Sequence, residues 1–86
     1  MLVIKRFTAA WCGPCRVLAP LFSQLEQEFP TVSFETIDVD QNKEEAAEYG
    51  IRSIPTVVYL KDGKVVNKLV GLSPLKTYTD SIKSFA

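Results

Sequence analysis

Two cysteines separated by two residues, Cys12 and Cys15, are the only cysteines in the chain, and the sequence predicts that a helix starts there. Backbone N–H groups at a helix start, with the positive end of the helix dipole, stabilise a nearby thiolate. Cys12 at that start is therefore the candidate nucleophile. Cys15, one turn further on, is close enough to form a disulfide with it. Pro14 suits the first helical turn, where a missing N–H costs nothing. The pattern indicates thiol–disulfide chemistry.

Other uses of this cysteine pair fit the sequence less well. A structural zinc ion needs four ligands, and two cysteines without any histidine would need a second subunit to complete the site. An iron–sulfur cluster shared between subunits has the same requirement. An inert disulfide would close a very short loop and would constrain the unfolded chain little. We therefore expect a redox pair and no metal.

The 86 residues and their zero formal net charge limit what the chain can be. The length predicts a single domain over residues 1–86, with enough chain for one core. A nucleic-acid-binding surface would need clustered basic residues, which are absent. The N-terminus has no long apolar run, so we expect neither a signal peptide nor a membrane span. A lone reactive pair suits a reducing compartment, which favours the cytoplasm.

The apolar pattern predicts strands that alternate with helices. Four segments have the composition of strands: residues 2–8, 32–39, 56–60 and 65–70. The last two are joined by Asp62-Gly63, a sequence typical of a tight hairpin. A strand, a crossover helix and a second strand form a right-handed parallel unit. The order of elements is therefore βαβαββα.

Three helices are expected between and after these strands. The first begins at the cysteine motif, contains Pro20 as a kink, and ends at Phe29-Pro30. A short second helix is expected to have Asp40 as its N-cap and to stop at Gly50. The third is expected to have Ser73 as its N-cap, with the following proline in the first helical position.

Joined to its other motifs, the sequence resembles the thioredoxin family from the first strand to the end. The residues that carry the resemblance are Phe7, Trp-Cys-Gly-Pro-Cys at 11–15, Pro20, Ile-Asp-Val-Asp at 37–40, Tyr-Gly-Ile-Arg-Ser-Ile-Pro-Thr at 49–56, and Val-Gly at 70–71. The family's N-terminal strand and helix have no counterpart in this sequence. The resemblance implies an α/β, thioredoxin-like fold of minimal, glutaredoxin-like size, with three helices and a four-stranded mixed sheet in the order 2-1-3-4.

The resemblance also implies a mechanism. The Cys12 thiolate would attack a disulfide in a client protein, and Cys15 would then attack Cys12 and release the reduced client. We expect Cys12 to be the exposed thiol of lower pKa, and Cys15 the shielded one of higher pKa. The implied partners are disulfide-containing clients and an electron-donating reductase, such as thioredoxin reductase. No cofactor beyond the Cys12–Cys15 disulfide is expected, and the protein should be a monomer.

Further motif and client-binding positions follow from the same resemblance: Trp11, Gly13, Pro14, Ile54, Pro55 and Gly71. Trp11 is expected to be an exposed aromatic contact, with ordinary core packing as the alternative. The Ile54–Pro55 bond is expected to be cis and opposite the cysteines, so that the backbone of Ile54 pairs with an extended client segment. Gly71 would let a client backbone approach closely, a plain strand-end turn being the alternative.

Two other classes of function remain open. A glutaredoxin-like enzyme would use glutathione, but the family's Gly-Gly and following acidic residue are replaced here by Val-Gly-Leu-Ser at 70–73, and the cysteines enclose Gly-Pro rather than Pro-Tyr. The fold could instead serve as a non-catalytic docking subunit of a larger enzyme, because a fold does not determine its use.

One position departs from the family pattern. Five residues before the motif's tryptophan, the family usually has a buried carboxylate that is thought to help deprotonate the second cysteine; this chain has Arg6, and Thr36 replaces the usual lysine partner. An unpaired buried guanidinium costs several kcal/mol. We therefore expect Arg6 to extend across the sheet to solvent, to pair with Asp38 or Asp40, or simply to lie on the surface. Cys15 is expected to lack a carboxylate base.

Overall fold

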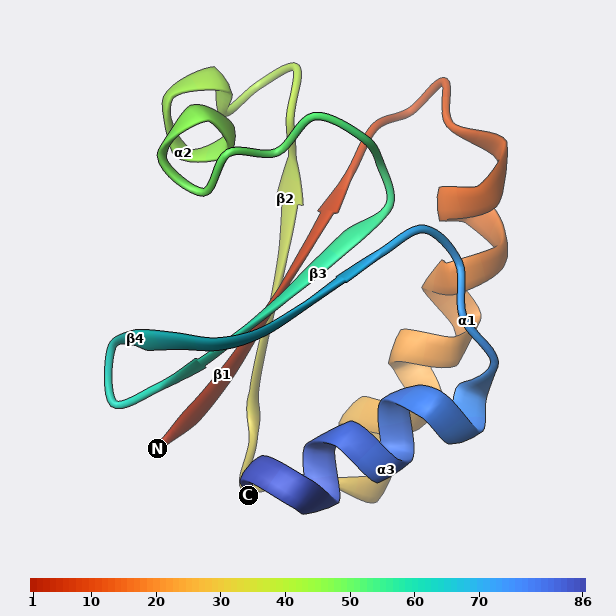
Figure 1. The fold of residues 1–86 in the computed structure, drawn as a ribbon. Coiled ribbons are helices and arrows are strands. Elements are labelled where there is room, and N and C mark those ends of the chain that lie inside the picture. Colours follow the sequence, from red (N-terminus) through yellow and green to blue (C-terminus); the bar gives the residue numbers. More distant parts are fainter.

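A computed structural model describes residues 1–86 and shows a twisted sheet with helices on both faces (Figure 1). The elements in chain order are β1 (Leu2–Thr8), α1 (Gly13–Glu28), β2 (Ser33–Asp38), α2 (Lys43–Glu48), β3 (Thr56–Lys61), β4 (Lys64–Val70) and α3 (Leu75–Phe85). The sheet order is β2-β1-β3-β4. β1 is parallel to β2 and antiparallel to β3, which is antiparallel to β4. The predicted fold class and strand order are confirmed.

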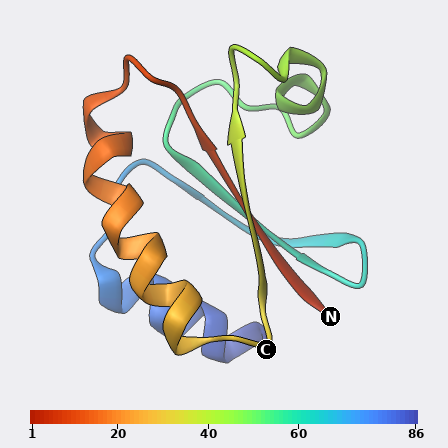
Figure 2. The same ribbon diagram turned by 180° about the vertical axis from the view of Figure 1, so that it is seen from behind.

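The two faces of the sheet are covered unequally. α1 and α3 lie together on one face, whereas only the short α2 lies on the other (Figures 1 and 2). The larger core is on the side of α1 and α3, where apolar residues of α1 at helical spacing meet the sheet: Leu18, Phe22 and Leu25. Removing each such side chain from water contributes about 1.5–3 kcal/mol. This packing fixes α1, and with it the cysteine motif, against the central strand β1.

The predicted strands and the first helix agree with the structure to within one residue at each strand end. Pro20 lies inside α1, and the helix ends at Phe29, whose N–H donates to the carbonyl oxygen of Leu25. The hairpin between β3 and β4 has positive φ angles at Asp62 (52°) and Gly63 (86°), the conformation that an Asp-Gly turn favours. These elements depend on local patterns, and local patterns were sufficient to predict them.

The predicted N-cap of α2 is wrong. The helix begins at Lys43 with Asn42 in the capping position, two residues beyond Asp40. The chain turns first, because Oδ1 of Asp38 accepts hydrogen bonds from the backbone N–H groups of Asp40 (2.8 Å) and Gln41 (3.3 Å). An aspartate that bonds to the backbone two residues on forms a turn of its own. The extra turn delays the start of α2.

The predicted N-cap of α3 is also wrong by one residue. Pro74 occupies the capping position in an extended conformation, and the helix begins at Leu75. The backbone N–H of Ser73 donates to the hydroxyl of Tyr78 at 3.1 Å, so Ser73 is held by a buried side chain of α3. This contact keeps Ser73 in the connection that leads from β4 into the helix.

Candidate active site

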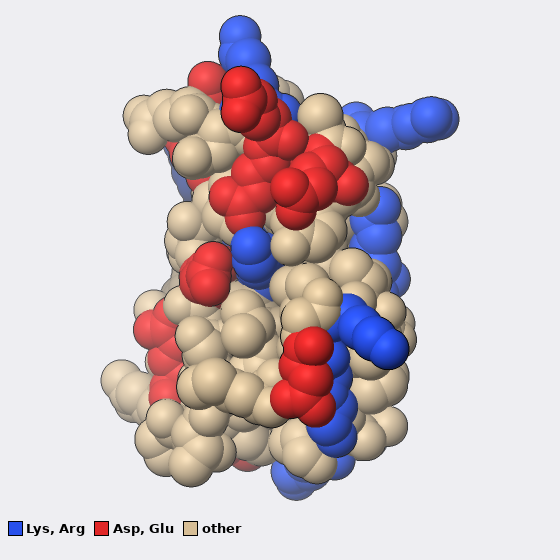
Figure 3. Space-filling view, turned by 90° about the vertical axis from the view of Figure 1, so that its left-hand side faces the viewer, with Lys and Arg blue, Asp and Glu red and all other residues tan.

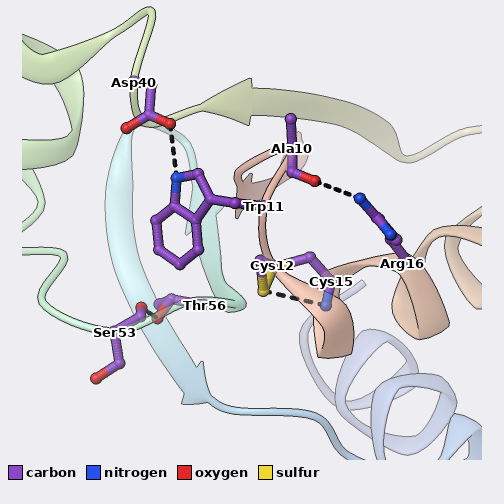
Figure 4. The surroundings of a disulfide bond; sticks show 8 residues. All are labelled: Ala10, Trp11, Cys12, Cys15, Arg16, Asp40, Ser53 and Thr56. Atoms are coloured by element: carbon purple, nitrogen blue, oxygen red, sulfur yellow. Dashed lines mark hydrogen bonds between the residues drawn. A yellow bond between two sulfur atoms is a disulfide. The ribbon is translucent and has the colours of Figure 1, made fainter.

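The cysteine pair lies where β1 passes through a short turn into α1. Cys12 is the N-cap of α1 and has an extended backbone (φ −92°, ψ 112°). Its sulfur accepts a hydrogen bond from the backbone N–H of Cys15 at 3.2 Å (Figure 4). The two residues form a disulfide, with their Cα atoms 5.3 Å apart. Sulfur at this position faces free N–H groups and the positive end of the helix dipole, which together stabilise a thiolate.

The expectation that Cys12 is exposed is wrong for the disulfide form. Cys12 is 4% exposed and Cys15 is 2% exposed. Both pack with Ala9 and with the partly buried Val39 and Ile54. These residues share one edge of the sheet, because Ala9 and Val39 follow the parallel strands β1 and β2, and Ile54 precedes the antiparallel β3. The two cysteines are therefore almost equally buried. What distinguishes them is that Cys12 precedes the first turn of α1, whereas Cys15 lies within it.

Trp11, by contrast, is an exposed aromatic residue and does not belong to the core. It is 68% exposed, and its indole Nε1–H donates to Oδ2 of Asp40 at 2.8 Å (Figure 4). That hydrogen bond fixes the ring beside the cysteines. A cavity of about 140 Å³ lies next to the ring and is lined partly by Val39, Ile51 and Ile54. The indole and this apolar lining form one side of the disulfide's surroundings.

The loop before β3 lies on another side of the disulfide. The Ile54–Pro55 peptide bond is cis, and Pro55 is fully buried. The hydroxyl of Thr56 donates to the carbonyl oxygen of Ser53 at 2.6 Å, which holds the loop together (Figure 4). Neither the N–H nor the C=O of Ile54 has a hydrogen-bond partner within the chain. Ile54 therefore presents a free backbone donor and acceptor next to the cysteines.

Gly71 borders the same region from the end of β4. Its N–H donates to the carbonyl oxygen of Pro55 at 2.8 Å, and its φ of +85° is a conformation that other residues adopt only with strain. A Cβ at this position would meet nothing within 4 Å. Gly71 is thus a strand-end turn with open space on one side of its Cα, which is compatible with both sequence interpretations.

Arg6 crosses the sheet face beneath α1, as one of the expectations proposed. Its Nη2 donates to Oγ1 of Thr36 at 3.0 Å, and its Cζ lies 5.2 Å from the centre of the Phe22 ring. No ion pair joins it to Asp38 or Asp40, so that alternative is wrong. Burial lowers the pKa of Arg6. Stacking on an aromatic ring, with its edge toward solvent, allows a guanidinium to replace the usual carboxylate here.

We expect an Arg6→Ala variant to reduce disulfides at close to the unmodified rate, because the guanidinium contacts Phe22 and Thr36 and makes no hydrogen bond to either sulfur. The measurement is kcat/KM with a disulfide-linked test protein, together with a urea titration to establish that the variant is folded. A loss of more than about tenfold in a folded protein, about 1.4 kcal/mol, would show that Arg6 takes part in the reaction.

Acidic side chains gather over α2, on the other side of the molecule from α3 (Figure 3). They come from the helix and from the turn before it: Asp40, Glu44, Glu45 and Glu48. Lys5 of β1 is bonded to Glu45 at 2.6 Å, and this hydrogen bond holds the pKa of Lys5 above its usual value. No group of three or more potential protein ligands is placed to hold a metal ion.

Sequence reasoning missed one functional contact, the hydrogen bond from Trp11 to Asp40. The two residues are 29 positions apart, and Asp40 was interpreted as a helix cap. The parallel register of β1 and β2 could have revealed the contact, because Thr8 lies opposite Asp38 and both strands end at that edge of the sheet. Three residues beyond Thr8 and two beyond Asp38, the side chains of Trp11 and Asp40 meet.

A disulfide at the N-terminus of the helix that follows the central strand, on this sheet order, defines a dithiol–disulfide protein of the thioredoxin-like class. Known proteins specify the class further. A family model described as Thioredoxin matches residues 1–84. The chain belongs to the thioredoxin family.

Individual relatives agree. The chain is 47% identical over 70 residues to a thioredoxin H-type of Picea mariana, an alignment that covers 81% of this chain and 56% of that protein. It is 42% identical over 81 residues to a thioredoxin of Mycoplasmoides gallisepticum, covering 94% and 81% of the two chains. The X-ray structure of Fasciola hepatica thioredoxin matches with a TM-score of 0.93 and 41% identity, over 99% of this chain and 81% of that one. The alignment thus spans little more than half the length of the Picea mariana protein.

Proposed function

We propose that this protein reduces disulfides in client proteins by means of the Cys12/Cys15 couple. The observation that carries the proposal is the disulfide itself, which lies at the N-terminus of α1 and beside the unpaired backbone groups of Ile54. A sulfur in that position is a good nucleophile when reduced, and an unpaired backbone segment can hold an extended chain. Membership of the thioredoxin family supports the same activity.

The reaction transfers two electrons from the dithiol to the client. The Cys12 thiolate attacks one sulfur of the client disulfide, and the other client sulfur leaves as a thiolate and takes up a proton. The Cys15 thiol then loses its proton and attacks Sγ of Cys12. This step forms the Cys12–Cys15 bond and breaks the bond to the client, whose second sulfur leaves with the electron pair. A reductase, by family resemblance thioredoxin reductase, returns two electrons to the disulfide.

The client would lie across the region between Trp11 and Gly71. Its extended backbone pairs with the free N–H and C=O of Ile54, in the manner of strand addition. Trp11 supplies an exposed apolar surface, and Gly71 leaves open space for a close approach. Gly13, where a Cβ would also meet nothing, keeps the start of the helix accessible next to Pro14 and the cysteines. Pro55, buried beneath Ile54, supports the loop.

The remaining properties follow from the chemistry. We place the protein in a reducing compartment, the cytoplasm, as a monomer in which residues 1–86 form one domain. It needs no cofactor other than its own disulfide and binds neither nucleic acid nor membranes. The absence of cysteines outside the redox pair supports a reducing environment. None of the helices combines the length and the apolar character needed to cross a membrane.

A turbidity assay tests the proposal against both alternatives. With dithiothreitol as electron source, the protein should accelerate the precipitation of a disulfide-linked test protein in the absence of glutathione. Acceleration only when glutathione is present would indicate a glutaredoxin-like enzyme. No acceleration under either condition would indicate a docking module. The double variant Cys12→Ser, Cys15→Ser is the matched control, since it retains the surface and lacks both thiols.

A further inference from the structure

A second cavity, of about 280 Å³, lies on the α1 side of the sheet and reaches Cys15 from behind. Its lining includes Cys15 and Arg16 of α1, Arg6 and Thr8 of β1, and Asp38 of β2, but neither Cys12 nor the Trp11–Ile54 region. It is therefore separate from the surface on which a client would lie. Half of its eight lining residues are polar or charged, and it is large enough for several water molecules.

Asp38 brings a fixed carboxylate into this cavity. It is the last residue of β2 and lies opposite Thr8, two residues beyond the pair formed by Arg6 and Thr36, so its side chain is on the same face of the sheet as theirs. Oδ1 is held by the N–H groups of two residues in the following turn. Oδ2 has no hydrogen-bond partner, and Asp38 forms no ion pair. One carboxylate oxygen is thus oriented by the turn and still free to bind.

We propose that Asp38 accepts the proton of Cys15, through water in this cavity, in the step that releases the client. The inference rests on the proposed function and adds a residue to it. The Cys15 thiol gives its proton to water, which passes one to Oδ2 of Asp38. The Cys15 thiolate attacks Sγ of Cys12, the Cys12–Cys15 bond forms, and the client sulfur leaves with the electron pair of the broken bond. Asp38 then returns the proton to solvent.

No other group in the cavity can take that proton. The charged and titratable groups that face Asp38 are Arg6 on β1, and Arg16 and Cys15 on α1. Guanidinium groups only donate hydrogen bonds and do not accept protons. Cys15 is 2% exposed. Burial of a thiol in apolar surroundings disfavours its ionisation, so a nearby base would help Cys15 to lose its proton.

Sequence reasoning expected Cys15 to have no carboxylate base, because the usual position is occupied by Arg6. The structure places a carboxylate in the same cavity from the neighbouring strand. Its position depends on the parallel register of β1 and β2 and on the turn that Asp38 itself closes. Neither feature is visible in the residues around the cysteines.

Asp38→Asn removes the proton acceptor and keeps the turn. Its amide oxygen can still accept the two turn hydrogen bonds, but the side chain can no longer act as a base. The reduced protein is mixed with one equivalent of an aromatic disulfide that releases a coloured thiolate in each step. The first phase reports attack by Cys12 and the second reports release by Cys15. We expect an unchanged first phase and a second phase about tenfold slower near neutral pH, a difference that shrinks as rising hydroxide concentration replaces the base.

Two further variants make the result decisive. Glu44→Gln removes the same charge from an exposed position on α2 and should change neither phase. Asp38→Glu keeps a carboxylate and should recover part of the second phase, with a pH profile that differs from that of the unmodified protein. Circular dichroism establishes folding. If Asp38→Asn does not fold, the profile of Asp38→Glu decides, and an unchanged profile overturns the proposal. Equal slowing of both phases, or an unchanged second phase in folded Asp38→Asn, also overturns it. Absence of a first phase in the unmodified protein would instead refute the proposed function.

Discussion

Replacing Cys12 by serine should lower the rate of client disulfide reduction by about 1000-fold or more, because the nucleophile that begins the reaction is lost. Replacing Cys15 by serine should have an equally large effect on turnover but a different effect on the first step. Its Cys12 thiolate still attacks at the start of α1, and the reaction stops at the mixed disulfide. Intact-mass measurement should therefore find a covalent client adduct on Cys15→Ser and none on Cys12→Ser.

Each variant is the control for the other, since both remove one thiol and leave the shape of the motif nearly unchanged. A stable adduct on Cys12→Ser, with none on Cys15→Ser, would reverse the assigned roles. Turnover retained by either variant would show that a single thiol suffices, which is the behaviour of a glutathione-dependent enzyme. Peptide mapping of the adduct formed by Cys15→Ser would also identify clients.

Replacing Phe22 by alanine should lower the free energy of unfolding by about 3–5 kcal/mol. The ring is buried beneath α1, makes edge-to-face contacts with Phe34 and Tyr78 at centroid distances of 5.8 and 6.1 Å, and supports the guanidinium of Arg6. Its removal leaves a cavity and deprives Arg6 of its stacking surface. Domains of this kind are stable by only about 5–15 kcal/mol, so the variant should be close to its folding limit.

Urea titration measures this loss, and two variants of graded size calibrate it. Phe22→Leu should cost less than about 1.5 kcal/mol in addition to the free energy of the buried apolar area that the smaller side chain loses, because an apolar side chain still fills most of the site. Val17→Ala, on the exposed side of α1, should change stability by no more than about 0.5 kcal/mol. A cost below about 1 kcal/mol for Phe22→Ala would contradict the packing described for this core.

The elements could be predicted from the sequence where one local pattern determines them. Apolar runs located the four strands, the cysteine motif and Phe29-Pro30 located the two ends of α1, and Asp62-Gly63 located the hairpin. The sheet order came from family resemblance. The two wrong N-caps have different causes. Asp38 closes a turn that delays the start of α2, and the backbone N–H of Ser73 bonds to the Tyr78 hydroxyl, which keeps Ser73 in the connection before α3.

The candidate site was predictable to a similar extent, and the predictions about it that were wrong failed for similar reasons. The motif spacing was enough to place Cys12 at the helix start, and the family pattern indicated Ile54 and Gly71. The burial of Cys12 was not predictable, because it depends on residues from three separate segments that meet at one sheet edge. The same is true of Asp38, whose side chain reaches the cavity behind Cys15 only through the pairing of β1 with β2.

The most direct measurement is brief alkylation of the reduced protein near neutral pH, followed by peptide mapping of the modified cysteine. The cysteines have nearly equal accessibility in the disulfide form, so a preference would reflect which sulfur is stabilised as a thiolate at the start of α1. The structure predicts that Cys12 is modified first and Cys15 remains largely unmodified. Preferential modification of Cys15 would contradict the assignment of Cys12 as the nucleophile.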